Sequence, residues 1–139
     1  MSNLKTALLA AIVSSVLACS ASAQSNVWLI GEVAPLTGPG ATVGTRLNKS
    51  TKMWAEQINA AGGIAGRKVE VITCNDEVRP EKAVACVRDM LAKGVMMIFG
   101  NTLTASIRAI EPLVAKGPVT LVPSPNILTP EDSYMFQVS

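Results

Sequence analysis

The chain of 139 residues contains no histidine, and its three cysteines form no Cys-x-x-Cys pair. Histidine and paired cysteines are the usual protein ligands of zinc, and histidine is the usual base beside a serine or cysteine nucleophile. The acidic residues form no pair that the sequence brings together. We therefore expect no metal, no cofactor and no catalytic centre, which means that the protein is not an enzyme.

Aromatic residues are also scarce, at 4% of the chain, and the formal net charge is only +2. Proteins that bind nucleic acid carry basic stripes or patches, often with interleaved aromatic residues, and this sequence has neither. We therefore exclude nucleic acid as a partner. Hydrophobic residues make up 49% of the chain, which is enough for the core of one domain.

The first 23 residues have the parts of an export signal. Lys5 supplies a positive start, "ALLAAIVSSVLA" is an apolar run too short to span a bilayer, and "ASA" is a small-x-small cleavage site. The overlapping "VLAC" would also permit lipoprotein processing, with a lipid anchor on Cys19. We favour simple cleavage after Ala23, which predicts a periplasmic mature chain of residues 24–139.

Cleavage at that point would leave two cysteines, Cys74 and Cys86. An even pair in an exported protein suggests a disulfide. The alternative is two separate buried thiols. Cys74 should end a strand and Cys86 should lie in the next helix, and this arrangement can place two cysteines too far apart to bond.

The rest of the sequence alternates strand-like and helix-like segments. Strand-like runs occupy residues 27–33, 68–73, 95–99, 119–122 and 134–138. Segments with helical periodicity occupy residues 47–61, 80–93 and 104–116. Pro112 predicts a kink or a break in the last helix. In the first helix, the register of Trp54 favours the core over stacking on a ligand.

This order predicts an α/β fold with a doubly wound, Rossmann-like parallel sheet. In such sheets, ligands bind beyond the carboxyl ends of the strands, where the strand order reverses. Four loops should share that rim: residues 34–44, 74–79, 100–104 and 123–129.

The loop "APLTGPGATVG" after the first strand resembles a dinucleotide-binding fingerprint. Its spacing is G-x-G-x-x-x-G, one residue too long, and Pro39 lacks the N–H that a phosphate would need. A nucleotide-dependent enzyme is therefore the less favoured hypothesis. A connection without any ligand role is another alternative.

Five segments carry a resemblance to a known family: "IGEVAPLTGPGATVG", "EQINAAGGIAGRKVEVI", "PEKAVACVRDML", "IFGNTLTASI" and "LVPSPNILTP". In this order they resemble the substrate-binding proteins of branched-chain amino-acid ABC transporters, the leucine-binding-protein-like periplasmic binding proteins of type I. The resemblance implies a protein that delivers an amino acid or a similar small carboxylate to an ABC transporter permease. Members of this family have two lobes, so residues 24–139 would be an incomplete N-terminal lobe without the second. The alternative is a truncated product with no transport role.

The resemblance also implies where the ligand would be held. Thr104 matches a ligand-binding serine at a helix start, where free N–H groups attract an anion. It could instead be an ordinary N-cap, with Thr102 as a rival for the cap and a weaker ligand contact. Ser124 and Asn126 match the segment that completes the carboxylate site. Val43 stands where some relatives carry an aromatic residue, and it would offer a small apolar contact.

Overall fold

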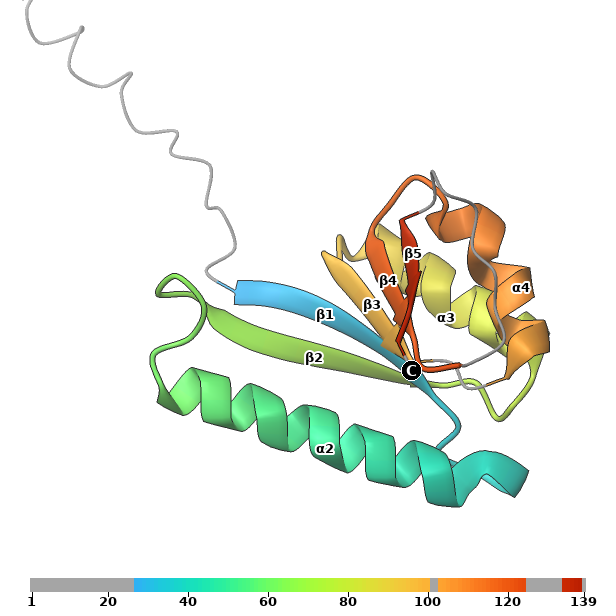
Figure 1. Ribbon diagram of the computed structural model, residues 1–139, viewed down its shortest axis with the longest axis horizontal. Coiled ribbons are helices and arrows are strands. Elements are labelled where there is room, and N and C mark those ends of the chain that lie inside the picture. Colours follow the sequence, from blue (N-terminus) through green and yellow to red (C-terminus); the bar gives the residue numbers. More distant parts are fainter. Residues whose placement is uncertain (1–26, 101–102, 125–133, 139) are drawn as a thin grey trace, which may run out of the picture.

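The computed structural model describes residues 27–100, 103–124 and 134–138 (Figure 1). The export signal predicted for residues 1–23 lies outside them. Along the described chain the elements are β1 (Val27–Ala34), the 3-10 turn η1 (Gly38–Gly40), α2 (Ala41–Ala60), β2 (Lys68–Asn75), α3 (Pro80–Ala92), β3 (Met97–Gly100), α4 (Thr104–Val114), β4 (Val119–Val122) and β5 (Met135–Gln137).

The strands form one sheet in the order β2-β1-β3-β4-β5, and neighbouring strands are parallel. The chain runs from β1 outward to β2, returns across β1 to β3, and then continues to β5 at the other edge. This is the order of a doubly wound sheet, with the reversal between β1 and β3. The predicted fold class is confirmed.

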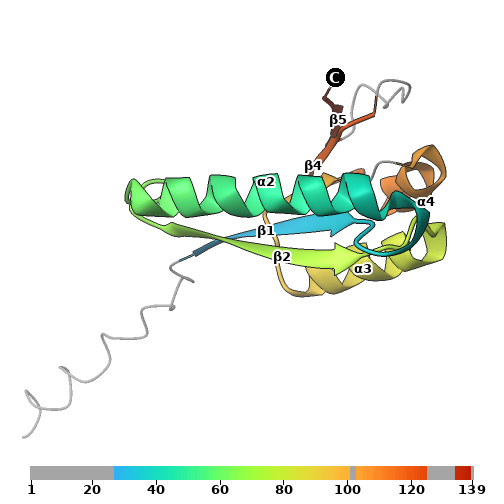
Figure 2. The ribbon, with the colours of Figure 1, turned by 90° about the horizontal axis from the view of Figure 1, so that it is seen from below.

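Helices cover the two faces of the sheet unequally. Figure 2 shows β1 and β2 between α2 on one side and α3 on the other. The larger core lies on the side of α3 and α4, where Val33, Met90, Ile98 and Ile107 are all at most 1% exposed. Side chains alternate between the faces of a strand, so every second residue of β1 and β3 enters this core.

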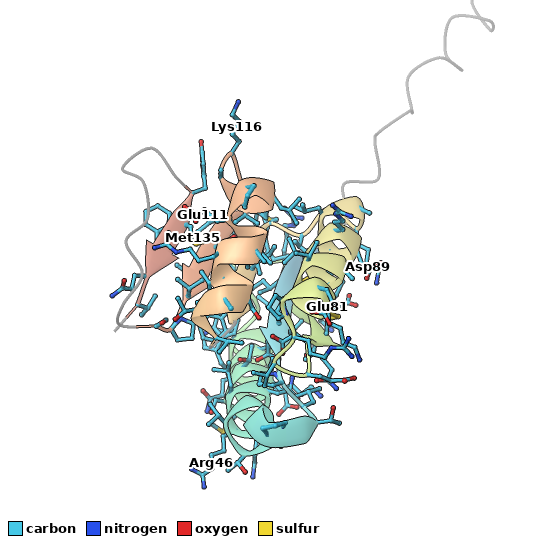
Figure 3. All side chains as sticks on the ribbon, turned by 90° about the vertical axis from the view of Figure 1, so that its right-hand side faces the viewer. Arg46, Glu81, Asp89, Glu111, Lys116 and Met135 are labelled. Atoms are coloured by element: carbon cyan, nitrogen blue, oxygen red, sulfur yellow. A yellow bond between two sulfur atoms is a disulfide. The ribbon has the colours of Figure 1, made fainter. Side chains whose placement is uncertain are left out.

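The outer layer on this side consists of α3 and α4, which pack against each other. Figure 3 shows this layer, with Glu81 and Asp89 of α3 pointing away from α4. Both acidic side chains are exposed, whereas Ala83, Cys86 and Val87 of the same helix are buried. The helix therefore has the apolar face that its sequence periodicity predicts.

The opposite face is only partly covered, because α2 packs on β1 and β2. Beyond them, Phe99, Leu121 and Phe136 stand in register on β3, β4 and β5, and Phe136 is 50% exposed. A groove of about 350 Å³ runs along α2, and Leu47, Trp54 and Phe99 are among the residues that line it. The prediction that Trp54 belongs to the core is wrong, because its side of α2 borders this groove and the side chain is 38% exposed.

Element boundaries differ from the sequence-based expectations at several points. The first helix begins at Ala41 rather than at residue 47, and the third strand covers Met97–Gly100 rather than residues 95–99. The predicted break at Pro112 is wrong, because α4 continues to Val114. Pro112 lies in the last turn, so its missing N–H removes a hydrogen bond only at the end of the helix.

Candidate functional site

The candidate site lies at the carboxyl ends of β1 and β3, where the strand order reverses. The two strands end side by side, with Val33 paired to Gly100. The segment 35–40 follows β1 and leads into α2, and α4 begins shortly after β3. These two segments bracket the point at which doubly wound sheets bind their ligands.

Thr104 is the first residue of α4, and it is exposed. The prediction that Thr104 lies at a helix start is confirmed. The alternative that it is the N-cap is wrong, because Leu103 occupies that position and provides no side-chain cap. The N–H of Ile107 bonds to the carbonyl of Leu103 at 3.0 Å, and the N–H groups before it have no acceptor within the helix. These N–H groups and the helix dipole favour an anion beside Thr104.

Ser106 adds a second hydroxyl to the same turn of α4. Its side chain is completely buried, and its Oγ has no hydrogen-bond partner among the described residues. Residues two positions apart on a helix do not face the same side, so the buried Ser106 lies on the packed face of α4 and the exposed Thr104 lies away from it. The sequence did not predict that this serine would be buried.

Of the other predicted ligand contacts, the structure describes Ser124 and Val43. Ser124 lies two residues beyond β4, is 5% exposed, and donates its N–H to the carbonyl of Val122 at 3.0 Å. Val43 lies in the first turn of α2 and is 57% exposed. Parallel strands end at one edge, so Val43, Thr104 and Ser124 come to the same rim. Thr102 and Asn126 lie outside the described residues, and the ligand roles remain predictions.

Two of the glycines after β1, Gly40 and Gly44, serve close packing. A Cβ on Gly44 would lie 2.6 Å from the carbonyl carbon of Pro35 and closer still to its oxygen. A Cβ on Gly40 would lie 2.6 Å from Cγ2 of Val78, in the loop after β2. The glycine spacing therefore lets the start of α2 pack on its own preceding loop and on a neighbouring loop. Neither glycine has to be explained by a nucleotide phosphate.

A disulfide joins Cys74 at the end of β2 to Cys86 in α3, with their Cα atoms 5.8 Å apart. This separation is in the ordinary range for a disulfide, so the strand–helix arrangement does not forbid the bond. The two residues are not separate thiols. The bond fixes the start of the loop after β2 against α3.

Asp76 begins that loop, and its side chain is nearly completely buried, at 1% exposure. Burial raises the pKa of this carboxyl, and a hydrogen bond from the N–H of Val78 opposes the rise. The Asp76 carbonyl accepts the N–H of Arg79 at 2.8 Å, which closes the turn before α3. These contacts are within the loop, so Asp76 orders the turn that leads into α3.

A second buried carboxylate, Glu32 of β1, lies under α2. Its Oε2 accepts Asn48 Nδ2 at 2.5 Å and the Thr73 hydroxyl at 3.0 Å. Its Oε1 has no partner among the residues that the structure describes. Because the side chain is completely buried, we assign this cluster to the attachment of α2 to the sheet.

The described residues contain no group of three or more histidine, cysteine or acidic side chains arranged to hold a metal ion. Within the same residues, none of the helices is both long and apolar enough to cross a bilayer.

The sequence is similar to curated amino-acid-binding proteins. It is 31% identical over 93 residues to Leu/Ile/Val-binding protein homolog 3 of Brucella melitensis, a match that covers 67% of this chain and 25% of that protein. It is 32% identical over 118 residues to an amino acid binding protein of Pseudomonas aeruginosa, which covers 84% and 31% respectively. The chain thus matches about a quarter to a third of the length of these relatives.

Solved structures show the same fold. A solute binding protein of an ABC transporter from Rhodopseudomonas palustris, in complex with 3,4-dihydroxy benzoic acid, superposes with a TM-score of 0.71 at 24% identity, covering 81% of this chain and 31% of that one. A branched-chain amino acid transporter substrate binding protein from Streptococcus pneumoniae, in complex with isoleucine, gives 0.68 at 22% identity, covering 80% and 33%.

The match to a family model extends over nearly all of the described residues. The model of the periplasmic binding proteins matches residues 28–139, from the second residue of β1 to the last residue of the chain. Together with the parallel sheet and its strand order, this match shows that the chain belongs to the periplasmic binding protein family.

Proposed function

We propose that this chain is part of the substrate-binding component of an ABC transporter, and that it captures an amino acid or a similar small carboxylate. Its curated relatives include a Leu/Ile/Val-binding protein homolog and an amino acid binding protein. Two structures with the same fold hold isoleucine and 3,4-dihydroxy benzoic acid. These two molecules differ in their side groups but share a carboxylate.

The observation that carries this proposal is the start of α4. It combines an exposed Thr104 with N–H groups that have no acceptor within α4, beside the reversal of strand order. A carboxylate has only acceptor atoms, so it is suited to a site that offers N–H and O–H donors. Ser124 and Asn126 would supply further donors from the loop after β4. Val43 would add an apolar contact, and Thr102 a weaker polar one.

The proposal extends to location and partners. The signal predicted for residues 1–23 would export the chain to the periplasm, where the bound solute passes to the transporter's permease. A lipid anchor on Cys19 is the less favoured alternative. Binding of this kind needs no cofactor, because its selectivity comes from hydrogen bonds and the shape of the pocket.

The experiment is a titration of the isotope-labelled full chain, followed by amide NMR, with L-leucine, L-isoleucine, L-valine and 3,4-dihydroxybenzoate. We expect shifts at the amides of residues 104–107. Thr104→Val should weaken binding about tenfold, because a hydrogen bond to a charged group is lost. The matched control is Thr45→Val, an exposed threonine within α2, which should leave the affinity unchanged. Absence of shifts at the start of α4 with all four probes would refute the proposal, and equal affinity of Thr104→Val and wild type would remove Thr104 from the site.

A further inference from the structure

The side chain of Asn75 connects two loops of the rim. Its Oδ1 accepts the N–H of Leu36 at 2.8 Å and the N–H of Glu77 at 3.2 Å. Its Nδ2 donates to the hydroxyl oxygen of Thr37 at 2.8 Å. One amide group thereby holds the loop after β1 and the loop after β2 together.

Asn75 is itself firmly anchored. It is the last residue of β2 and is paired with Ala34 at the end of β1. The preceding residue, Cys74, is bonded to Cys86 of α3. The following residue, Asp76, closes the turn before α3 through its carbonyl. The backbone on both sides of Asn75 is thus fixed before its side chain reaches the neighbouring loop.

The loop that Asn75 holds leads directly to the candidate site. Leu36 and Thr37 precede η1, which continues without a gap into α2. The packing of Val78 against Gly40 is a second contact between the same two loops. The segment 35–40 is therefore positioned from the β2 side, and it follows directly on β1, which lies beside β3 at the reversal of strand order.

We propose that Asn75 is a positioning residue for ligand binding: it holds the segment 35–40 in the conformation that forms one wall of the site. This inference rests on the proposed function, because it assigns the ligand to the rim beside this segment. It concerns a residue that acts through the loop and does not itself touch the ligand. Replacing Asn75 should then weaken ligand binding, whereas a substitution elsewhere that costs the same stability should not.

The structure offers a matched control in Asn59, near the end of α2. Its Nδ2 donates to the carbonyl of Val69 at 2.8 Å, and its Oδ1 accepts the N–H of Val69 at 2.7 Å. It connects a helix to β2 as Asn75 connects a loop to β2, but near the opposite end of that strand. Asn59→Ala therefore removes two hydrogen bonds between elements away from the rim, whereas Asn75→Ala removes two to the loop after β1 and one within its own loop.

The test compares the affinities of the full-length wild type, Asn75→Ala and Asn59→Ala for the four probes named above, and measures the urea midpoint of each. Both variants should lose similar stability. Asn75→Ala should also weaken binding about tenfold, which corresponds to one or two lost hydrogen bonds, and Asn59→Ala should bind as the wild type does. Equal affinity losses in the two variants would overturn the proposal.

A milder pair of variants covers the case in which Asn75→Ala does not fold. Thr37 is exposed, so Thr37→Val removes the acceptor of Asn75 Nδ2 without disturbing the core. It should weaken binding about threefold, and Thr37→Ser, which retains the hydroxyl, should restore wild-type affinity. Identical affinities for Thr37→Val and Thr37→Ser would contradict the positioning role.

Amide hydrogen exchange separates this proposal from the proposed function. The Leu36 amide should exchange faster in Asn75→Ala than in Asn59→Ala, whether or not a probe binds. If the wild type binds none of the four probes, the proposed function fails and the affinity role of Asn75 fails with it. If probes bind but Leu36 exchange is unchanged in Asn75→Ala, only the positioning role is refuted.

Discussion

Replacing a glycine within a helix by alanine usually stabilises a protein, but the structure predicts that Gly44→Ala destabilises this one. Gly44 lies in the first turns of α2 and is buried, although most of its neighbours in that turn are exposed. Its Cα faces the backbone of Pro35, and an added Cβ would lie 2.6 Å from the Pro35 carbonyl carbon. A backbone carbonyl cannot rotate away as a flexible side chain can, so the helix and the loop would have to separate.

The magnitude follows from two opposing contributions. Alanine stabilises a helix by about 1 kcal/mol relative to glycine at an interior position. Carbon atoms in ordinary contact are about 3.5 Å apart or more, so the start of α2 would have to move by about 1 Å. Overpacking of this kind costs about 1–3 kcal/mol, and the rigid backbone on both sides places this site at the upper end. We expect Gly44→Ala to lower the free energy of unfolding by about 1–2 kcal/mol in total.

Urea denaturation followed by circular dichroism measures this change, with midpoint and slope fitted for each variant. The control is Ser50→Ala in the same helix. Ser50 is exposed, and among the described residues its hydroxyl bonds only to the carbonyl of Arg46, at 3.1 Å, so alanine should leave the stability unchanged or raise it slightly. A Gly44→Ala variant as stable as the wild type, or more stable, would refute the packing argument.

Two further predictions concern the loop after β2. Replacing Cys74 and Cys86 with alanine should lower the free energy of unfolding by about 3 kcal/mol, because the bond closes a loop with a sequence separation of 12; a loss below about 1 kcal/mol, measured in urea, would contradict this. Burial raises the pKa of Asp76 in the folded state above its usual value of about 4. At a pH between these two pKa values, the folded state binds a proton that the unfolded state has released. The contribution of Asp76 to stability is therefore complete below about pH 4 and declines as the pH rises through the folded pKa. The stability of the wild type relative to Asp76→Asn should fall over this interval, and a difference that does not depend on pH would show that burial does not perturb this group.

The sequence predicted the candidate site in outline. The helix start at Thr104 was predicted, and the strand order places the three described candidates, Val43, Thr104 and Ser124, at one rim. It did not predict the hydrogen bonds of Asn75 or the burial of Ser106. An asparagine at a strand end is ordinary in a sequence, and its hydrogen bonds here reach a loop 39 positions earlier in the chain.

The amino-acid sequence by itself determined the alternation of strands and helices and the doubly wound class, because apolar periodicity and turn residues act over short distances along the chain. The family was indicated by the resemblance of five segments of the sequence to its members. Only the tertiary structure decided what each element faces. Trp54 has the helical register of a core residue, but it borders an open groove because α2 packs mainly on β1 and β2. Gly40 and Gly44 resemble a phosphate-binding pattern, but two packed loops require them. In each case the deciding contact joins separate elements or loops, and local periodicity carries no information about which of them become neighbours.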